Sequence, residues 1–278
     1  MSIKITTLIE DTLNKNSNLI SEHGLSFLIE CDNKKILFDT SQSDNFIANA
    51  KKLNIDLYDV DYVVISHGHY DHANGFKSFC DISRKNFSLY INHKFFDRKY
   101  SKKHGNFIYK GANFDKQFLI DRKINTFFVD KDITNLTPKI NIISNIKRTT
   151  YYERINSNFY INIDNSYVKD CFDDEIVLTI DTPKGLIVLV GCSHIGIINI
   201  LKTVEERLHN KIYGIIGGTH LIEADESRID LTLNEFKKMD LKFIGISHCT
   251  GAKALEKLEN NFGDIYFNNN AGNIINIL

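Results

Sequence analysis

The sequence predicts an α+β fold in which two β-sheets pack against each other and helices cover their outer faces. Two observations support this prediction. The chain carries hairpin patterns over residues 24–41 and 175–194, and a helix pattern follows each of them. Polar residues, mostly histidines, stand where several apolar strands end. Each hairpin has an apolar face to bury, and packing the two faces together buries both.

The first half of the chain predicts a hairpin, a short helix and a buried strand. Two β-rich apolar runs flank a polar turn within 24–41, and the hairpin ends at Asp39. Apolar residues recur at i, i+4 and i+7 within 46–53, which is the spacing of a short amphipathic helix. The apolar run 62–65 then predicts a buried strand that breaks into a loop rich in histidine.

The second half repeats this plan. The hairpin 175–194 ends in a second polar loop, and apolar residues on one face predict a helix over 197–208. Two more buried strands, within 212–220 and 241–251, each run from apolar residues into glycine or serine and then histidine. A last amphipathic pattern predicts a closing helix over 255–262. We therefore expect a site where polar strand ends from the two halves meet.

The span 84–174 differs from the rest of the chain. It is rich in Lys, Asn, Tyr and Phe, with weak periodicity and no clear helix caps. We interpret it as an insertion within a single domain that spans 1–278. Its aromatic side chains would either form a lid over the site or cover an exposed sheet, and the sequence leaves both interpretations open.

Composition excludes several classes of function. The 34 basic and 35 acidic side chains give a net charge of −1, so nucleic acid and anionic membranes are not expected as partners. The longest strongly apolar run, 186–190, is far shorter than the roughly 20 residues that a membrane span needs. Five scattered cysteines and no signal-peptide pattern predict a reducing, cytoplasmic location. We expect a small-molecule substrate, and the sequence does not predict an oligomeric state.

The segment 66–72 carries the strongest chemical signal. It places three imidazoles and one carboxylate in six positions directly after an apolar strand: His67, His69, Asp71 and His72. Neutral imidazole and carboxylate are good ligands for zinc and its neighbours, and Gly68 lets the backbone fold tightly enough for the side chains to converge. The sequence therefore predicts a metal site.

This segment resembles the HxHxDH motif of the metallo-β-lactamase superfamily. The resemblance implies a four-layer αββα sandwich and a site for two divalent metal ions. His67 and His69 would bind the first metal, and Asp71 and His72 the second. Asp39 would then hydrogen-bond the ligand loop and orient it.

A wider set of motifs resembles one branch of this superfamily, which is named for 7,8-dihydropterin-6-ylmethyl-4-(β-D-ribofuranosyl)aminobenzene 5′-phosphate synthase. The pieces GCSHIG, GGTHL and SHCTG carry this resemblance, together with ILFDTS and SHGHYDHANG. They lie outside the span 84–172, so most of the remaining chain takes part.

The sequence departs from the superfamily pattern at one ligand. Most members have an aspartate where this chain has the run from Gly191 to His194. Either His194 or the Cys192 thiolate would replace it, and we favour His194. His248 is the expected last ligand. His220 would bind metal, donate a hydrogen bond to an oxyanion, or serve only as a structural residue near the sheet edge, and we assign it to the catalytic group.

The expected activity is hydrolysis of a small phosphorylated or ester-like substrate by a metal-activated water. Asp71 would position this water, and His220 would offset the developing negative charge. Two alternatives remain open: the condensation that gives the branch its name, with a pterin substrate and release of pyrophosphate, and ligand binding without turnover. Zinc is the default metal, with manganese and iron as alternatives, because His and Asp ligands suit all three.

Overall fold

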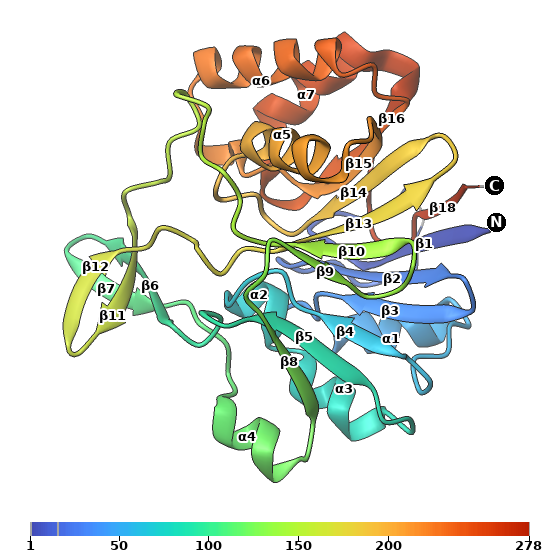
Figure 1. The fold of residues 1–278 in the computed structure, drawn as a ribbon, viewed down its shortest axis with the longest axis vertical. Coiled ribbons are helices and arrows are strands. Elements are labelled where there is room, and N and C mark those ends of the chain that lie inside the picture. Colours follow the sequence, from blue (N-terminus) through green and yellow to red (C-terminus); the bar gives the residue numbers. More distant parts are fainter. Residues whose placement is uncertain (1, 16, 278) are drawn as a thin grey trace. The chain divides into compact units, whose positions relative to one another are not determined.

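The computed structural model describes residues 2–15 and 17–277. The chain divides into two units, each with its own large sheet (Figure 1). Unit 1 comprises Met1–Val129, Asn158–Asp170 and Asn270–Leu278. Unit 2 comprises Asp130–Ser157 and Cys171–Asn269. Both units combine helices with sheets that contain antiparallel pairs, so the predicted α+β class is confirmed.

The large sheet of unit 1 contains both predicted strands of the first hairpin. The two strands pair antiparallel, and the turn residues Asp32 and Asn33 both have positive φ, as a tight two-residue hairpin turn requires. Strands β4 and β5, which follow the hairpin, run parallel to its second strand, β3. Helices connect these strands, as parallel pairing requires. The strand order is β18-β1-β2-β3-β4-β5-β8, with bounds β18 Ile274–Ile277, β1 Ile3–Ile9, β2 Ser26–Cys31, β3 Lys34–Phe38, β4 Tyr62–Val64, β5 Ser88–Asn92 and β8 Asn125–Val129.

Short helices enclose the core of unit 1. The predicted helix at 46–53 is present as α1, and its buried residues, including Phe46 and Ala50, pack with those of the sheet. Phe76 and Phe79 from α3 join the same cluster, where Phe76 lies 4.9 Å from Phe114 between ring centroids. The helices are α1 Asn45–Lys52, α2 Tyr70–Ala73, α3 Phe76–Ile82 and α4 Lys116–Asp121.

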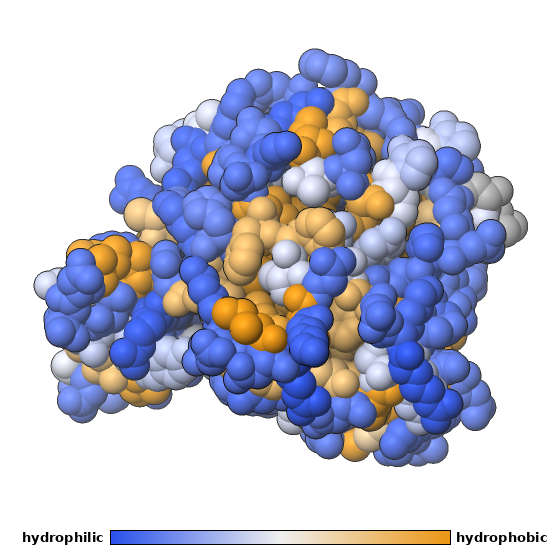
Figure 2. Space-filling view, turned by 60° about the horizontal axis from the view of Figure 1, so that its bottom comes forward, coloured by the Kyte–Doolittle hydropathy of each residue, from blue (hydrophilic) through white to orange (hydrophobic). Residues whose placement is uncertain are grey.

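A separate four-stranded sheet also belongs to unit 1 and lies at the left of Figure 1. Phe107 and Tyr167 stack across it with ring centroids 3.7 Å apart. Several of its apolar side chains are exposed, among them Ile108 and Val168, and orange residues appear on this lobe in Figure 2. The order is β12-β11-β6-β7, with bounds β12 Ser166–Lys169, β11 Phe159–Ile163, β6 Arg98–Lys103 and β7 Asn106–Tyr109.

The large sheet of unit 2 contains the second predicted hairpin and the three strands that follow it in parallel. Every residue of β14 is buried, as expected for a strand covered on both faces. The parallel register brings the carboxyl ends of β14, β15 and β16 to one edge of the sheet. The order is β17-β16-β15-β14-β13-β10-β9, with bounds β17 Tyr266–Asn268, β16 Phe243–Ser247, β15 Ile212–Gly218, β14 Gly185–Val190, β13 Val177–Thr182, β10 Ile140–Ile143 and β9 Ile133–Asn135.

Three helices accompany this sheet. The predicted helices at 197–208 and 255–262 are present as α5 and α7, and α6 lies between them in sequence. The first two turns of α5 are buried on nearly all sides, since every residue from Ile197 to Val204 except Lys202 is buried. The bounds are α5 Ile197–Leu208, α6 Glu226–Lys238 and α7 Ala252–Phe262, with short 3₁₀ turns η1 Leu221–Glu223, η2 His248–Thr250 and η3 Gly263–Ile265.

The span 84–174, which we interpret as an insertion, contributes to all three sheets. Strands β5 and β8 extend the large sheet of unit 1, β9 and β10 extend that of unit 2, and the small sheet comes entirely from this span. Of the aromatic residues in this span, Phe114 is buried, whereas Tyr109 and Tyr151 are exposed.

Among the described residues, no helix has the length and apolar character needed to cross a membrane.

Candidate metal centre

The predicted ligand loop of unit 1 begins where β4 ends. The rings of His67 and His69 lie 4.8 Å apart between centroids, and those of His67 and His72 lie 4.3 Å apart. Asp71 Oδ2 lies 3.6 Å from His72 Nε2. All four side chains are buried. The tight loop therefore brings three imidazoles and a carboxylate into one cluster, as the spacing predicts.

Asp39 fixes this loop from the neighbouring strand. Since β3 and β4 are parallel with Phe38 opposite Val64, Asp39 emerges beside the start of the loop. Its Oδ1 accepts a hydrogen bond from the Ser66 N–H at 2.7 Å, and its Oδ2 accepts one from the Ser66 hydroxyl at 2.8 Å. Asp39 Oδ2 also lies 2.6 Å from His72 Nδ1. The predicted supporting contact of Asp39 is confirmed, and it leaves His72 Nε2 as the nitrogen available to a metal.

The electrostatic environment favours a neutral imidazole at His67. Complete burial lowers the pKa of His67 well below its ordinary value, and the neighbouring His72 and His69 lower it further. A neutral imidazole is the form that binds metal. The charge state of His67 is therefore the one that a ligand needs.

His23 contacts the cluster more closely than the sequence indicates. Its Nε2 lies 3.3 Å from Asp71 Oδ2, and its Nδ1 lies 3.0 Å from Asp11 Oδ2. The ring is half exposed, so it stands between the buried Asp71 and solvent. No local pattern in the sequence distinguishes His23 or Asp11 from ordinary solvated polar residues.

Glycines let other segments approach the ligand loop. Gly24 has φ +144°, and a Cβ there would lie 2.6 Å from the carbonyl oxygen of Asp71. The next residue, Leu25, donates its N–H to the same carbonyl at 3.2 Å, while the Thr40 N–H donates to the His72 carbonyl at 2.7 Å. Backbone contacts on both sides therefore hold the loop in shape.

The predicted residues of unit 2 all follow the carboxyl ends of its parallel strands. Cys192 and His194 follow β14, His220 follows β15 and His248 follows β16. The backbones of His220 and His248 are left-handed, with φ 47° and 58°. This conformation is uncommon for residues other than glycine, although histidine adopts it more readily than most. The backbone therefore bends at each strand end to present a polar side chain.

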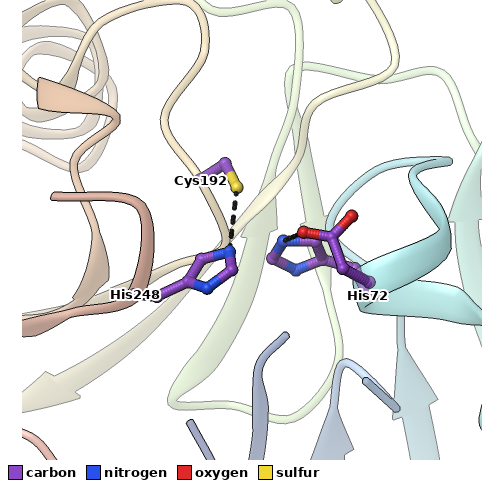
Figure 3. Close-up of side chains that lie close together, drawn as sticks. His72, Cys192 and His248 are labelled. Carbon is purple, nitrogen blue, oxygen red and sulfur yellow. Dashed lines mark hydrogen bonds and ion pairs between the residues drawn. The ribbon is translucent and has the colours of Figure 1, made fainter. Parts of the chain in front are cut away.

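Within unit 2 these residues form two contacts. The Cys192 Sγ lies 3.4 Å from His248 Nε2, and Figure 3 shows the thiol directed at this ring. The His194 ring lies 4.1 Å from the His220 ring between centroids and stacks on Phe172 at 3.9 Å. Cys192 is thus the residue of the pair that contacts His248, whereas the favoured alternative, His194, contacts His220.

Glu175 holds the loop that carries His194. Its two carboxylate oxygens accept the N–H groups of His194 and Ile195, each at 2.9 Å. Burial raises the pKa of Glu175 to about 7, although these two hydrogen bonds oppose the increase. The sequence gives no signal for this contact, because Glu175 only begins the predicted hairpin and is 19 residues away from His194.

His220 has two acidic neighbours in unit 2. The ring nitrogen Nε2 of His220 lies 3.3 Å from Glu223 Oε2, and the backbone N–H of His220 donates to Cys249 Sγ at 3.3 Å. Burial alone would lower the pKa of His220, but the contacts with Cys249 and Glu223 raise it to about 9. Cys249 was not among the expected site residues, since a cysteine after histidine carries no signal of its own.

Unit 1 also contains a buried ion pair that no pattern in the sequence indicates. Lys99 Nζ lies 2.9 Å from Asp170 Oδ2, and both side chains are almost fully buried. Lys99 connects to the ligand loop through the backbone, because its carbonyl accepts from Lys110 N–H and the Lys110 carbonyl accepts from Tyr70 N–H. Backbone hydrogen bonds therefore connect the small sheet, which contains Lys99, to the predicted ligand loop.

The donor chemistry fits divalent transition metals. Unit 1 supplies buried imidazoles and a carboxylate. Asp39 orients one of the imidazoles, the ring of His72, and a histidine ligand is usually held by a carboxylate in this way. Unit 2 supplies imidazoles together with thiols, which bind softer ions such as zinc.

Comparisons with known proteins agree with this chemistry. Residues 21–120 match the family described as the metallo-beta-lactamase superfamily. The chain is 33% identical to the 7,8-dihydropterin-6-methyl-4-(beta-D-ribofuranosyl)-aminobenzene-5′-phosphate synthase of Methanocaldococcus jannaschii, over 99% of this chain and 96% of the relative. The crystal structure of Tm1679, a metal-dependent hydrolase of the beta-lactamase superfamily, is similar, with a TM-score of 0.85, 30% identity and 99% coverage of both chains.

Proposed function

The chain belongs to the metallo-β-lactamase superfamily, and from this premise we propose that it is a metal-dependent hydrolase with a dinuclear centre. The substrate would be a small phosphorylated or ester-like molecule. The observation that carries the proposal is the buried cluster of His67, His69, Asp71 and His72, oriented by Asp39. Such a cluster is costly to bury unless it binds something, because imidazole and carboxylate groups lose their hydration there.

The proposed ligands follow the resemblance. His67 and His69 would hold the first ion, and Asp71 and His72 the second. His194 and His248 would complete the set, with Cys192 as the alternative to His194. We propose zinc for both ions, since a ligand set dominated by histidine suits it.

The residues would divide the chemistry as follows. Bound divalent ions lower the pKa of a coordinated water and polarise the substrate oxygen. Asp71 would accept a hydrogen bond from the attacking water and so hold it in line with the carbonyl or phosphoryl centre. His220 would offset negative charge on the substrate oxygen, unless it binds metal itself.

Metal analysis and a substrate screen test this proposal. The protein is screened with p-nitrophenyl esters, phosphodiesters and lactones, before and after treatment with a chelator. We expect turnover of at least one class, lost with the metal and restored by zinc. Asp71→Ala should lower both metal content and activity, the latter by about a hundredfold or more. The exposed Asp121→Ala is the matched control and should change neither. Full metal loading and activity in Asp71→Ala would reject the assignment.

A second function is favoured by the similarity to the M. jannaschii synthase over nearly the whole chain. In this alternative, a dihydropterin diphosphate condenses with a ribofuranosylaminobenzene phosphate and releases pyrophosphate. Metal ligands would then serve to hold the diphosphate leaving group. Pterin absorbance in the purified protein, together with pyrophosphate release from the two substrates, would favour the synthase over the hydrolase.

We also propose a cytoplasmic location. None of the five cysteines forms a disulfide within the described residues, which agrees with a reducing compartment. Fractionation of cells that produce the protein tests this point.

A further inference from the structure

Unit 2 contains a group of three potential ligands, one of which, Cys249, lies outside the predicted metal set. Cys192, His220 and Cys249 each offer one ligand atom, and these three atoms lie within 4.8 Å of one another. They come from the ends of three adjacent parallel strands, β14, β15 and β16. Both cysteines are buried, with exposed fractions of 2% and 6%. Residues more than 20 positions apart in sequence thus converge at one edge of the sheet.

The absence of a side chain at Gly218 makes this convergence possible. Cys249 follows β16 and must reach across the end of β15 to approach Cys192 after β14. A Cβ at Gly218, the last residue of β15, would lie 2.6 Å from Cys249 Sγ and 2.7 Å from the Gly191 carbonyl oxygen. With glycine there, the Cys249 thiol lies over the strand and donates to the Cys192 carbonyl at 3.4 Å.

The donor atoms match the preferences of a thiophilic cation. Two thiolates and an imidazole make up three of the four positions of a tetrahedral zinc site, and thiolate ligands favour zinc or copper(I) over harder ions. Zinc–sulfur bonds of about 2.3 Å place two sulfur ligands about 3.8 Å apart, so the observed grouping needs only small side-chain rotations to close on an ion.

We propose that Cys192, His220 and Cys249 together bind one thiophilic cation. The site lies wholly within unit 2 and goes beyond the proposed function, in which Cys249 has no part. It gives His220 the ligand role that the sequence leaves open. An imidazole ligand keeps its second nitrogen for a hydrogen bond, and Glu223 lies 3.3 Å from Nε2 of this ring.

Cobalt titration of the metal-free protein tests the proposal, because thiolate ligands give cobalt(II) intense near-ultraviolet charge-transfer absorption. We expect this band in the wild-type protein at saturation. It should fall to about half in Cys249→Ser and in Cys192→Ser, and disappear in the double variant. Cys171→Ser is the matched control, since this cysteine is an exposed thiol of the same unit. A band in Cys249→Ser equal to that of the wild type would overturn the proposal.

A second test measures X-ray absorption at zinc in the unmodified protein, so it does not depend on whether a variant folds. We expect a shell of sulfur scatterers at about 2.3 Å from zinc. A spectrum with only nitrogen and oxygen neighbours would overturn the proposal, as would a Cys192–Cys249 disulfide in protein purified without oxygen. The outcome is separable from that of the proposed function through Cys249→Ser. Cys249 is outside the ligand set of that function, so a thiolate band that came from Cys192 in the predicted set alone would be unchanged in this variant.

Discussion

The buried carboxylate of Glu153 predicts an unusual dependence of stability on pH. Its two oxygens accept the N–H groups of Ile198 and Asn199, in the first turn of α5, at 2.8 and 2.7 Å. Burial raises the pKa of Glu153 from 4.5 to about 7, even though these hydrogen bonds favour the ionised form. Between these two values the folded chain retains a proton that the unfolded chain has lost.

The sign and size of the effect follow from linkage. Because the folded state binds more protons in this window, the free energy of unfolding falls as the pH rises from 4.5 through about 7. A pKa change of about 2.5 at about 1.36 kcal/mol per unit corresponds to roughly 3 kcal/mol, which is a large share of the stability of a typical domain. Glu153→Gln should remove this part of the slope, since an amide does not titrate.

Urea unfolding of the metal-free protein at several pH values measures the effect. The chain has no tryptophan, so far-ultraviolet circular dichroism should follow the transition. Metal is removed because ligand binding itself depends on pH. Glu259→Gln, an exposed change on α7, is the control and should keep the wild-type slope.

The opposite sign would refute the reasoning. The two N–H donors and the amino end of α5 both stabilise a carboxylate. Should they outweigh burial, stability would rise with pH in the wild-type protein and fall relative to it in Glu153→Gln. Parallel curves for the two proteins would show that Glu153 does not titrate in the window at all.

Three further predictions follow from contacts described above. Asp39→Asn should lower the affinity for zinc, measured by isothermal titration, by about 10- to 100-fold, with little loss of helix content. Unchanged affinity would mean that the carboxylate does not orient the loop. Gly218→Ala should weaken the cobalt charge-transfer band, because the new methyl group would displace the Cys249 thiol; an undiminished band would contradict the close approach. Asp170→Asn should lower the free energy of unfolding in urea by about 3–5 kcal/mol, because Lys99 is then charged and buried without its partner. Adding Lys99→Met to this variant should restore most of the loss. A loss below about 1 kcal/mol would show that water reaches the pair.

Much of the regular structure could be predicted, because periodicity acts over a few neighbouring residues. Both hairpins and the helices α1, α5 and α7 lie where alternation and helical spacing indicate. Asp39 could also be assigned, since a polar residue at one strand end meets the loop after the adjacent parallel strand.

Other features depend on contacts between residues distant in sequence. Glu175 reaches His194 through the backbone N–H, so neither side chain reveals the pairing. Cys249 reaches Cys192 only because a glycine on the strand between them leaves room. The small sheet draws strands from two separate stretches, and its short, mixed sequences carry no clear period.

The left-handed backbone at His220 and His248 has a consequence for stability. At such positions, glycine would relieve a steric penalty of about 1–2 kcal/mol, so each of the two rings is held at a conformational cost. Glycine at either strand end would therefore give a more stable backbone and remove one candidate ligand, so that stability and metal binding should change in opposite directions.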